Sequence, residues 1–137
     1  MKKYVLGLDE LDTMLEDIAK DFSSGVVVLR GDLAAGKTTF VKKMAKFLGT
    51  HDEVTSPTFS LQHCYGDKIF HYDMYNQGLE HFMSLGMLEE LERDGLHFVE
   101  WGDDELINIL TSAEIKTMVI DIEKISDNKR EYKICMY

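Results

Sequence analysis

The sequence predicts an α/β fold with a mostly parallel sheet, flanked by helices and completed by a C-terminal antiparallel hairpin. Three observations predict it. Apolar runs of strand length alternate with helical patterns, a glycine-rich turn joins one such run to a helix, and 137 residues with 45% hydrophobic content support one core. There is one proline and no repeat or linker-like stretch. We therefore expect residues 1–137 to form a single domain.

Apolar spacing assigns the elements in the first half of the chain. Residues 8–22 carry leucine, isoleucine and phenylalanine at helical spacing, with Asp9 as the expected N-cap. Residues 25–30 form a continuous apolar run that is typical of a buried strand. Residues 39–48 return to helical spacing. Residues 51–57 are expected to connect that helix to the next strand, because Thr-Ser-Pro disfavours helix.

Strands dominate the second half of the pattern. Gly86 interrupts one helical stretch and predicts two short segments there, and Ser126-Asp127-Asn128 is typical of a turn between two terminal strands. The expected elements, in order, are strands at 59–65 and 69–73, helical segments within 79–92, a strand at 96–100, a helix at 104–110, and strands at 117–125 and 131–136.

The glycine-rich turn carries the strongest functional signal. Residues 31–38 satisfy G-x-x-x-x-G-K-[ST], the phosphate-binding loop (P-loop) of nucleoside triphosphatases, between the expected strand and helix. Backbone N–H groups and the helix N-terminus would converge on the phosphates of a nucleotide. Lys37 would bridge the β- and γ-phosphates, and the Thr38 hydroxyl would bind Mg²⁺. The sequence thus predicts a single P-loop NTPase domain.

Two further strands end in a carboxylate, Asp73 and Glu100. Ligands of such sheets gather at the carboxyl ends of the strands, so at least one of these residues is expected to face the metal or the γ-phosphate. The spacing leaves open which one binds the metal. Residues 55–60 carry hydroxyls suited to a γ-phosphate sensor, or form only a polar turn. His71 and His97 lie in strand patterns, where a structural role is the common one.

Composition excludes several classes of function. A net charge of −10 argues against direct binding of nucleic acid. The exposed lysines 42, 43 and 46 form either a solvated helix face or a docking surface. The N-terminal residues fit neither a signal peptide nor a membrane span, so we expect a soluble, cytoplasmic protein.

Cys64 and Cys135 are expected to be reduced, partly buried thiols. Trp101 either packs in the core or reports on the nucleotide site.

Four short motifs occur in a specific order: GDLAAGKTT at 31–39, SPTF at 56–59, HYDMY at 71–75 and EW at 100–101. Their order and spacing resemble the bacterial TsaE (YjeE) family, the ATPase component of the tRNA threonylcarbamoyladenosine machinery. The resemblance covers about residues 1–110. It implies a small P-loop fold that binds ATP and Mg²⁺ and hydrolyses ATP slowly. It also implies TsaD and TsaB as partner subunits, with tRNA met only indirectly through the complex.

The resemblance also assigns roles to individual residues. Thr38 and Glu100 would hold Mg²⁺, Asp73 would lie by the γ-phosphate, and Thr58 would be the switch residue. The residues expected to contact the nucleotide are Asp9, Ala34, Ala35, Gly36, Lys37, Thr38 and Thr39. This sequence departs from the family at Ala34, where glycine is usual, and at Asn76, where arginine is usual.

Two alternatives to an ATPase stay open at this point. A small-molecule kinase would begin with the same loop, but kinases clamp phosphates with arginines, and this chain has only Arg30, Arg93 and Arg130. A nucleotide-gated assembly switch with little intrinsic hydrolysis would use the same residues. Measuring phosphate release with and without partner subunits separates these classes.

Overall fold

The computed structural model describes residues 1–32, 36–50, 53–55, 62–74 and 78–137. Eight strands among them form one sheet in the order β1-β8-β7-β2-β6-β5-β4-β3. The strands are β1 Lys2–Leu6, β2 Gly25–Arg30, β3 Glu53–Thr55, β4 Gln62–Tyr65, β5 Ile69–Asp73, β6 Leu96–Glu100, β7 Thr117–Lys124 and β8 Arg130–Met136. The helices are the 3-10 turn η1 Leu8–Glu10 and the α-helices α1 Asp12–Asp21, α2 Lys37–Phe47, α3 Leu79–Ser84, α4 Met87–Leu91 and α5 Asp104–Ser112.

The centre of the sheet is parallel and its two ends are antiparallel. β2 pairs in parallel with β6 and β7, and β5 pairs in parallel with β6. The pairs β1–β8, β7–β8, β3–β4 and β4–β5 are antiparallel. Short turns join β4 to β5 and β7 to β8, and a short turn can connect only antiparallel neighbours. The sheet is therefore mixed, and the parallel pairing expected from the sequence is confined to four central strands.

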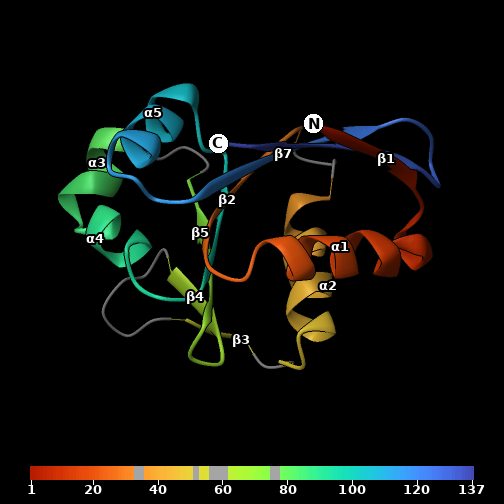
Figure 1. Ribbon diagram of the computed structural model, residues 1–137, viewed down its shortest axis with the longest axis horizontal. Coiled ribbons are helices and arrows are strands. Elements are labelled where there is room, and N and C mark those ends of the chain that lie inside the picture. The colour runs from red at the N-terminus through yellow and green to blue at the C-terminus, as the bar shows by residue number, and fades with distance from the viewer. Residues whose placement is uncertain (33–35, 51–52, 56–61, 75–77) are drawn as a thin grey trace.

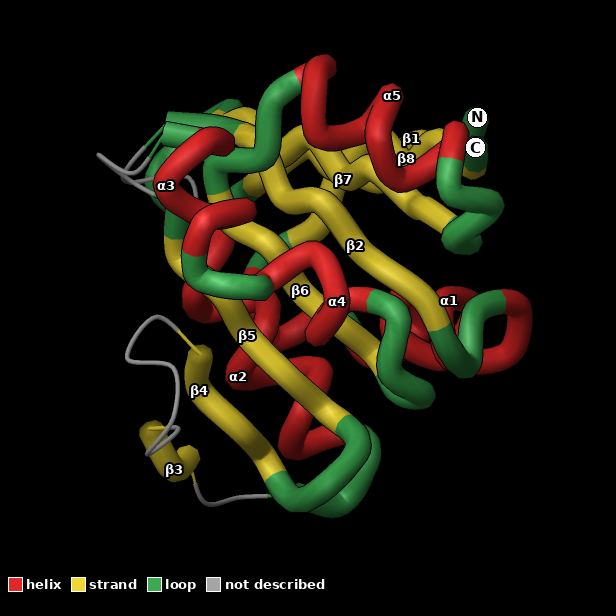
Figure 2. Tube along the Cα trace, turned by 90° about the vertical axis from the view of Figure 1, so that its left-hand side faces the viewer, coloured by secondary structure: helices red, strands yellow, loops and turns green. Residues whose placement is uncertain are grey.

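Helices cover both faces of the sheet (Figure 1). α1 and α2 pack on one face, which we call the α2 face, over a core that includes Val27, Leu29 and Phe98. The three other α-helices pack on the opposite face, over a core that includes Val28 and Val99. Because side chains alternate along a strand, neighbouring residues of β2 and β6 enter different cores. Figure 2 shows the twisted strands passing between the two groups of helices.

Most of the elements expected from the sequence are confirmed. The strands at 25–30, 69–73 and 96–100 have the expected bounds, Gly86 separates α3 from α4, and β7 and β8 form the terminal hairpin. Cys64 and Cys135 are free and half-buried. In the part of the chain that the structure describes, each helix is too short or too polar to cross a bilayer.

The expectations for the N-terminal segment and for the connector need correction. Residues 2–6 form an edge strand paired with β8, which the sequence analysis missed, and a short strand lies within the expected connector at 53–55. Asp9 is not a helix N-cap. The 3-10 turn begins after Gly7, whose N–H donates to the Glu10 carboxylate at 2.8 Å, and α1 begins after Leu11. The helical spacing thus spans two separate helical segments.

Candidate functional site

The carboxyl ends of the central strands bring several of the predicted site residues together at one end of the sheet. Glu100, at the end of β6, lies opposite Leu29 of β2 and Asp73 of β5. Paired residues on neighbouring strands point to the same face, so the Asp73 and Glu100 side chains share the α2 face. β2 then leads through Gly31 and Asp32 towards α2. This end of the sheet therefore combines two carboxylates with the start of a helix.

Lys37 is the first residue of α2 and is buried, with 3% of its surface exposed. The helix follows Gly36, whose φ of 103° is left-handed and unfavourable for any residue with a Cβ atom. The Lys37 ammonium donates hydrogen bonds to the carbonyl oxygens of Gly31 at 2.6 Å and Asp32 at 2.7 Å. A buried cation is thus held at the end of β2, against the backbone that leads into the predicted phosphate-binding loop.

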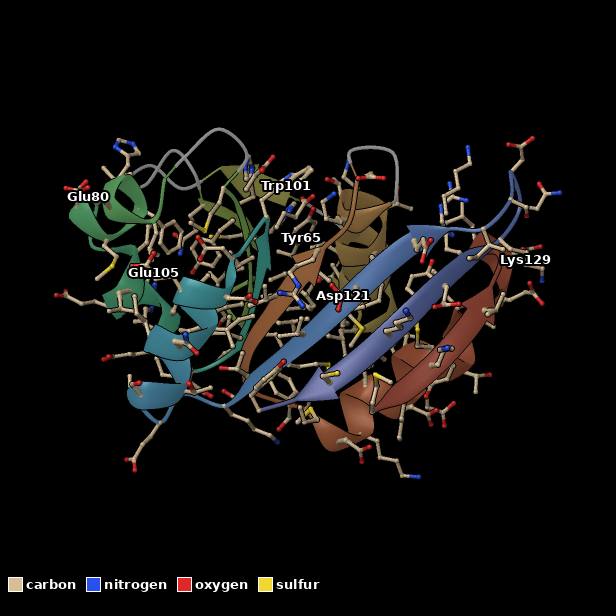
Figure 3. The ribbon with its side chains drawn as sticks, turned by 90° about the horizontal axis from the view of Figure 1, so that it is seen from above. Tyr65, Glu80, Trp101, Glu105, Asp121 and Lys129 are labelled. Carbon is tan, nitrogen blue, oxygen red and sulfur yellow. The ribbon has the colours of Figure 1, made fainter. Side chains whose placement is uncertain are left out.

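Trp101 covers this cation. Its ring centroid lies 3.9 Å from Lys37 Nζ, a cation–π contact, and its backbone N–H donates to the Leu29 carbonyl at 3.0 Å. Trp101 has a φ of 68°, which is strained for a bulky residue. The indole also packs against the core of the opposite face. Trp101 therefore packs in the core, which was one of the two roles considered for it, and it also contacts Lys37; whether it reports on a nucleotide stays a prediction. Figure 3 shows Trp101 at the edge where the strands end.

Glu100 accepts two hydrogen bonds on the same carboxylate oxygen. Thr38 Oγ1 donates to Oε2 at 2.8 Å, and His71 Nε2 forms a short hydrogen bond with the same Oε2. Glu100 and His71 are buried, with 3% and 5% of their surfaces exposed, whereas Thr38 is exposed. The three side chains come from β6, β5 and α2. They form a chain of polar contacts that leads from the core to the surface.

Opposing effects set the ionisation of this cluster. Burial would raise the pKa of Glu100, but the hydrogen bonds from His71 and Thr38, together with the positive charge of Lys37, outweigh it and hold that pKa below its usual value. Burial lowers the pKa of Lys37, and the charges of Glu100, Asp32 and Asp73 oppose the shift. The carboxylate of Glu100 is therefore anionic at neutral pH.

This set of donors fits Mg²⁺ and a phosphate. Mg²⁺ prefers hard oxygen ligands and binds proteins through one or two carboxylates or hydroxyls together with nucleotide phosphates. Thr38 and Glu100 supply a hydroxyl oxygen and a carboxylate within hydrogen-bonding distance of each other. Lys37 supplies a cation beside them, and α2 points its N-terminus at the same place. The negative charge of a phosphate would thus meet the positive charges of the metal ion and Lys37 and the positive end of the helix dipole.

The other predicted residues fall at different places. Asp73 is exposed on the strand next to Glu100, and its charge acts on Lys37. Thr39 follows Thr38 in the first turn of α2. Asp9 is exposed in η1, where it lines a hollow of about 520 Å³ with Lys129 and Asn128 of the β7–β8 turn. Ala34, Ala35, Thr58 and Asn76 lie outside the described residues.

A second buried polar cluster lies on the opposite face. His97 Nδ1 accepts from the Tyr72 hydroxyl at 2.8 Å, and His97 Nε2 donates to the Arg93 carbonyl at 2.8 Å. Gln62 Nε2 donates to the Tyr72 oxygen at 3.0 Å and to the Glu90 carboxylate at 2.9 Å. Both ring nitrogens of His97 are therefore satisfied, as in a structural histidine.

His71 is the site residue that sequence reasoning missed. It was assigned the same structural role as His97, which is confirmed for His97 by its two protein partners. His71 instead bonds to Glu100, and its Nδ1 is buried without a hydrogen-bond partner in the described structure. A signal was present in the sequence, because His71 and Asp73 are two residues apart on one strand and so share a face.

Comparisons with known proteins agree on one family. A model described as threonylcarbamoyl adenosine biosynthesis protein TsaE matches residues 7–132. A tRNA threonylcarbamoyladenosine biosynthesis protein TsaE from Treponema pallidum is 38% identical over 112 residues, which cover 80% of each chain. A protein of the same name from Aquifex aeolicus is 34% identical, over 98% of this chain and 96% of its own. The crystal structure of Bacillus subtilis YdiB matches with a TM-score of 0.64 and 27% identity, over 97% of this chain and 83% of that one.

Proposed function

The chain belongs to the TsaE family of tRNA threonylcarbamoyladenosine biosynthesis, and we propose that it acts there as an Mg²⁺-dependent ATP-binding protein and slow ATPase. The observation that carries the proposal is the cluster of Lys37, Thr38 and Glu100. A buried cation, the hydroxyl of an exposed threonine and an ionised carboxylate meet at the start of one helix. This combination matches the needs of a nucleotide triphosphate with its metal ion.

Each residue has a distinct part in the proposed activity. Lys37 leaves the Gly31 and Asp32 carbonyls and neutralises the β- and γ-phosphates, while the backbone of residues 34–39 cradles them. Thr38 and Glu100 would hold Mg²⁺, which would supply positive charge against the phosphates of the nucleotide. Asp73, at the γ-phosphate side, orients the attacking water together with the switch residue Thr58. Asp9 contacts the nucleotide from the first helical turn.

The charge of the chain supports an indirect role with tRNA. A net charge of −10 opposes the counterion release on which binding to a phosphate backbone depends. We therefore propose that the protein works in the cytoplasm through the TsaD and TsaB subunits, with TsaD performing the transfer. ATP binding and hydrolysis would drive repeated cycles of that complex, and tRNA would be reached through it.

The arrangement of the arginines disfavours the kinase alternative. Arg30 pairs with Asp121 at 2.9 Å and Asp104 at 2.8 Å, and Arg93 pairs with Glu90 at 2.9 Å. Arg130 donates to the backbone of the β7–β8 turn. A phosphoryl-transfer enzyme needs cations at the transferring group. The assembly switch stays as the second candidate, because the same cluster would bind ATP without hydrolysing it quickly.

Two measurements test the proposal. Calorimetric titration with ATP should show binding that is strengthened by MgCl₂ and weakened by EDTA, and the absence of nucleotide binding would refute the proposal. Phosphate release should be slow for the protein alone and faster with the TsaD and TsaB subunits. A Glu100→Ala protein that still supports repeated tRNA modification would favour the assembly switch over the ATPase.

A further inference from the structure

The function proposed for Glu100 depends on the orientation of its carboxylate, and the buried side chain of His71 contacts that carboxylate. We propose that His71 is a positioning residue, which holds Glu100 Oε2 so that the carboxylate faces the metal ion of the bound nucleotide. This inference rests on the proposed function. It adds a residue that contacts neither nucleotide nor metal and acts through Glu100.

The geometry makes His71 a donor to Glu100. Glu100 Oε2 also accepts a hydrogen bond from Thr38, so the nitrogen that faces the same oxygen is placed to donate, and Nε2 is that nitrogen. Nδ1 is then the bare nitrogen of a neutral ring. A protonated Nδ1 would leave a buried N–H without an acceptor in the described structure, which costs more than a lone pair without a donor. The neutral ring with its proton on Nε2 is the state that fits.

The contact also decides which carboxylate oxygen is available. Both hydrogen bonds from described residues fall on Oε2, so Oε1 receives none from that part of the chain. Thr38 alone is a poor anchor for the carboxylate, because it is an exposed residue and its hydroxyl is itself expected to bind the metal. The buried imidazole is fixed by β5 and supplies the rigid end of the contact. Such outer contacts orient metal ligands in many proteins.

Removing the His71 donor should therefore weaken the binding of Mg²⁺ and leave the affinity for ATP without Mg²⁺ largely unchanged. Loss of a hydrogen-bonding partner of a metal ligand commonly costs 10- to 100-fold in metal affinity. We expect His71→Leu to raise the MgCl₂ concentration that half-maximally tightens ATP binding by about tenfold or more. ATP affinity in EDTA should stay within about threefold of the parent protein, because Lys37 and the loop are untouched.

Two variants separate positioning from packing. His71→Gln keeps an amide N–H on a side chain of similar reach and should recover most of the Mg²⁺ dependence. His97→Leu is the matched control: it also removes a buried histidine from a neighbouring strand, but its contacts lie on the opposite face. It should lower the melting temperature and leave the half-maximal MgCl₂ concentration unchanged.

The experiment is calorimetric titration of ATP across a MgCl₂ series and in EDTA, with melting temperatures recorded for every variant. An unchanged MgCl₂ midpoint in His71→Leu overturns the proposal. So does an equal shift in His97→Leu, or a His71→Gln protein no better than His71→Leu. If the proposed function itself were wrong, the result would differ, because the parent protein would then show no Mg²⁺-dependent ATP binding.

Discussion

His71 and His97 lie on neighbouring strands and are both buried, but they differ in how many of their ring nitrogens have a hydrogen-bond partner in the described structure. His97 uses both ring nitrogens, towards the Tyr72 hydroxyl and the Arg93 carbonyl. His71 uses one nitrogen, towards Glu100, and its other nitrogen is without a partner in the described structure. Their side chains enter opposite faces of the sheet, because β5 and β6 run in parallel with Phe70 opposite His97.

This difference indicates that the cluster around His97 stabilises the fold and that the cluster around Glu100 is suited to bind a ligand. In the described structure, both ring nitrogens of His97 and the Tyr72 hydroxyl have protein partners, so the cluster contributes to folding and offers little to a ligand. On the α2 face, the hydrogen bonds that Lys37 donates within the described structure go to two backbone carbonyls, and those that Glu100 accepts there fall on one oxygen. Buried groups that are held but incompletely satisfied mark the place where a ligand completes the set.

The largest effect expected from this comparison is at Lys37. Lys37→Ala removes the charge that meets the phosphates and should weaken ATP binding by at least about a hundredfold, since charged hydrogen bonds contribute roughly 1.5–3 kcal/mol each. The melting temperature of the nucleotide-free protein should change little, because a buried cation costs desolvation energy. Calorimetry and thermal unfolding measure both quantities.

Lys43→Ala is the control for this change, because Lys43 is exposed on the same helix. It should bind ATP as the parent does. If Lys37→Ala bound ATP normally but lost stability, the α2 face would be a structural face like the other, and the distinction between the two faces would collapse.

The same comparison explains what the sequence could predict. The central strands β2, β5 and β6 were predicted at their observed bounds because they are largely buried and rich in β-branched and aromatic residues. β1 was missed because it is an edge strand with three of its five residues exposed, and its partner β8 lies more than a hundred residues away. Long-range pairing, rather than local pattern, makes it a strand.

The site residues also differ in whether a local pattern or long-range strand pairing brings them into the site. Lys37 and Thr38 are local features, so a short pattern identifies them. The hydrogen bond between His71 and Glu100 depends on the register that sets Asp73 opposite Glu100, and no spacing within the sequence gives that register. Sequence reasoning therefore named the carboxylates and missed the histidine that orients one of them.

An intermediate effect is expected at Asp73. Asp73→Asn keeps the size of the side chain and removes its charge, so ATP affinity should stay within about threefold while phosphate release falls tenfold or more. Calorimetry and a phosphate-release assay with the partner subunits give the two numbers. Asp94→Asn is the control, because Asp94 is exposed and pairs with Lys68 away from the site. Equal losses of binding and turnover in Asp73→Asn would contradict a role confined to hydrolysis.

The smallest effect expected is a pH dependence that belongs to the opposite face. Burial lowers the pKa of His97 below its ordinary value of 6.5; the Arg93 carbonyl and the carboxylates of Glu90 and Asp94 oppose that shift, and the Arg93 charge adds to it. Just below pH 6.5 the unfolded chain binds a proton that the folded protein does not, so stability falls as the pH drops.

A single proton limits the slope to about 1.4 kcal/mol per pH unit. Urea unfolding of the parent and of His97→Gln between about pH 7.5 and 5.5 should give curves that converge as the pH falls, because glutamine does not titrate. ATP affinity of the two proteins should stay equal at each pH. Parallel stability curves would remove His97 as the titrating group, and an altered ATP affinity would mean that the two faces of the sheet are coupled.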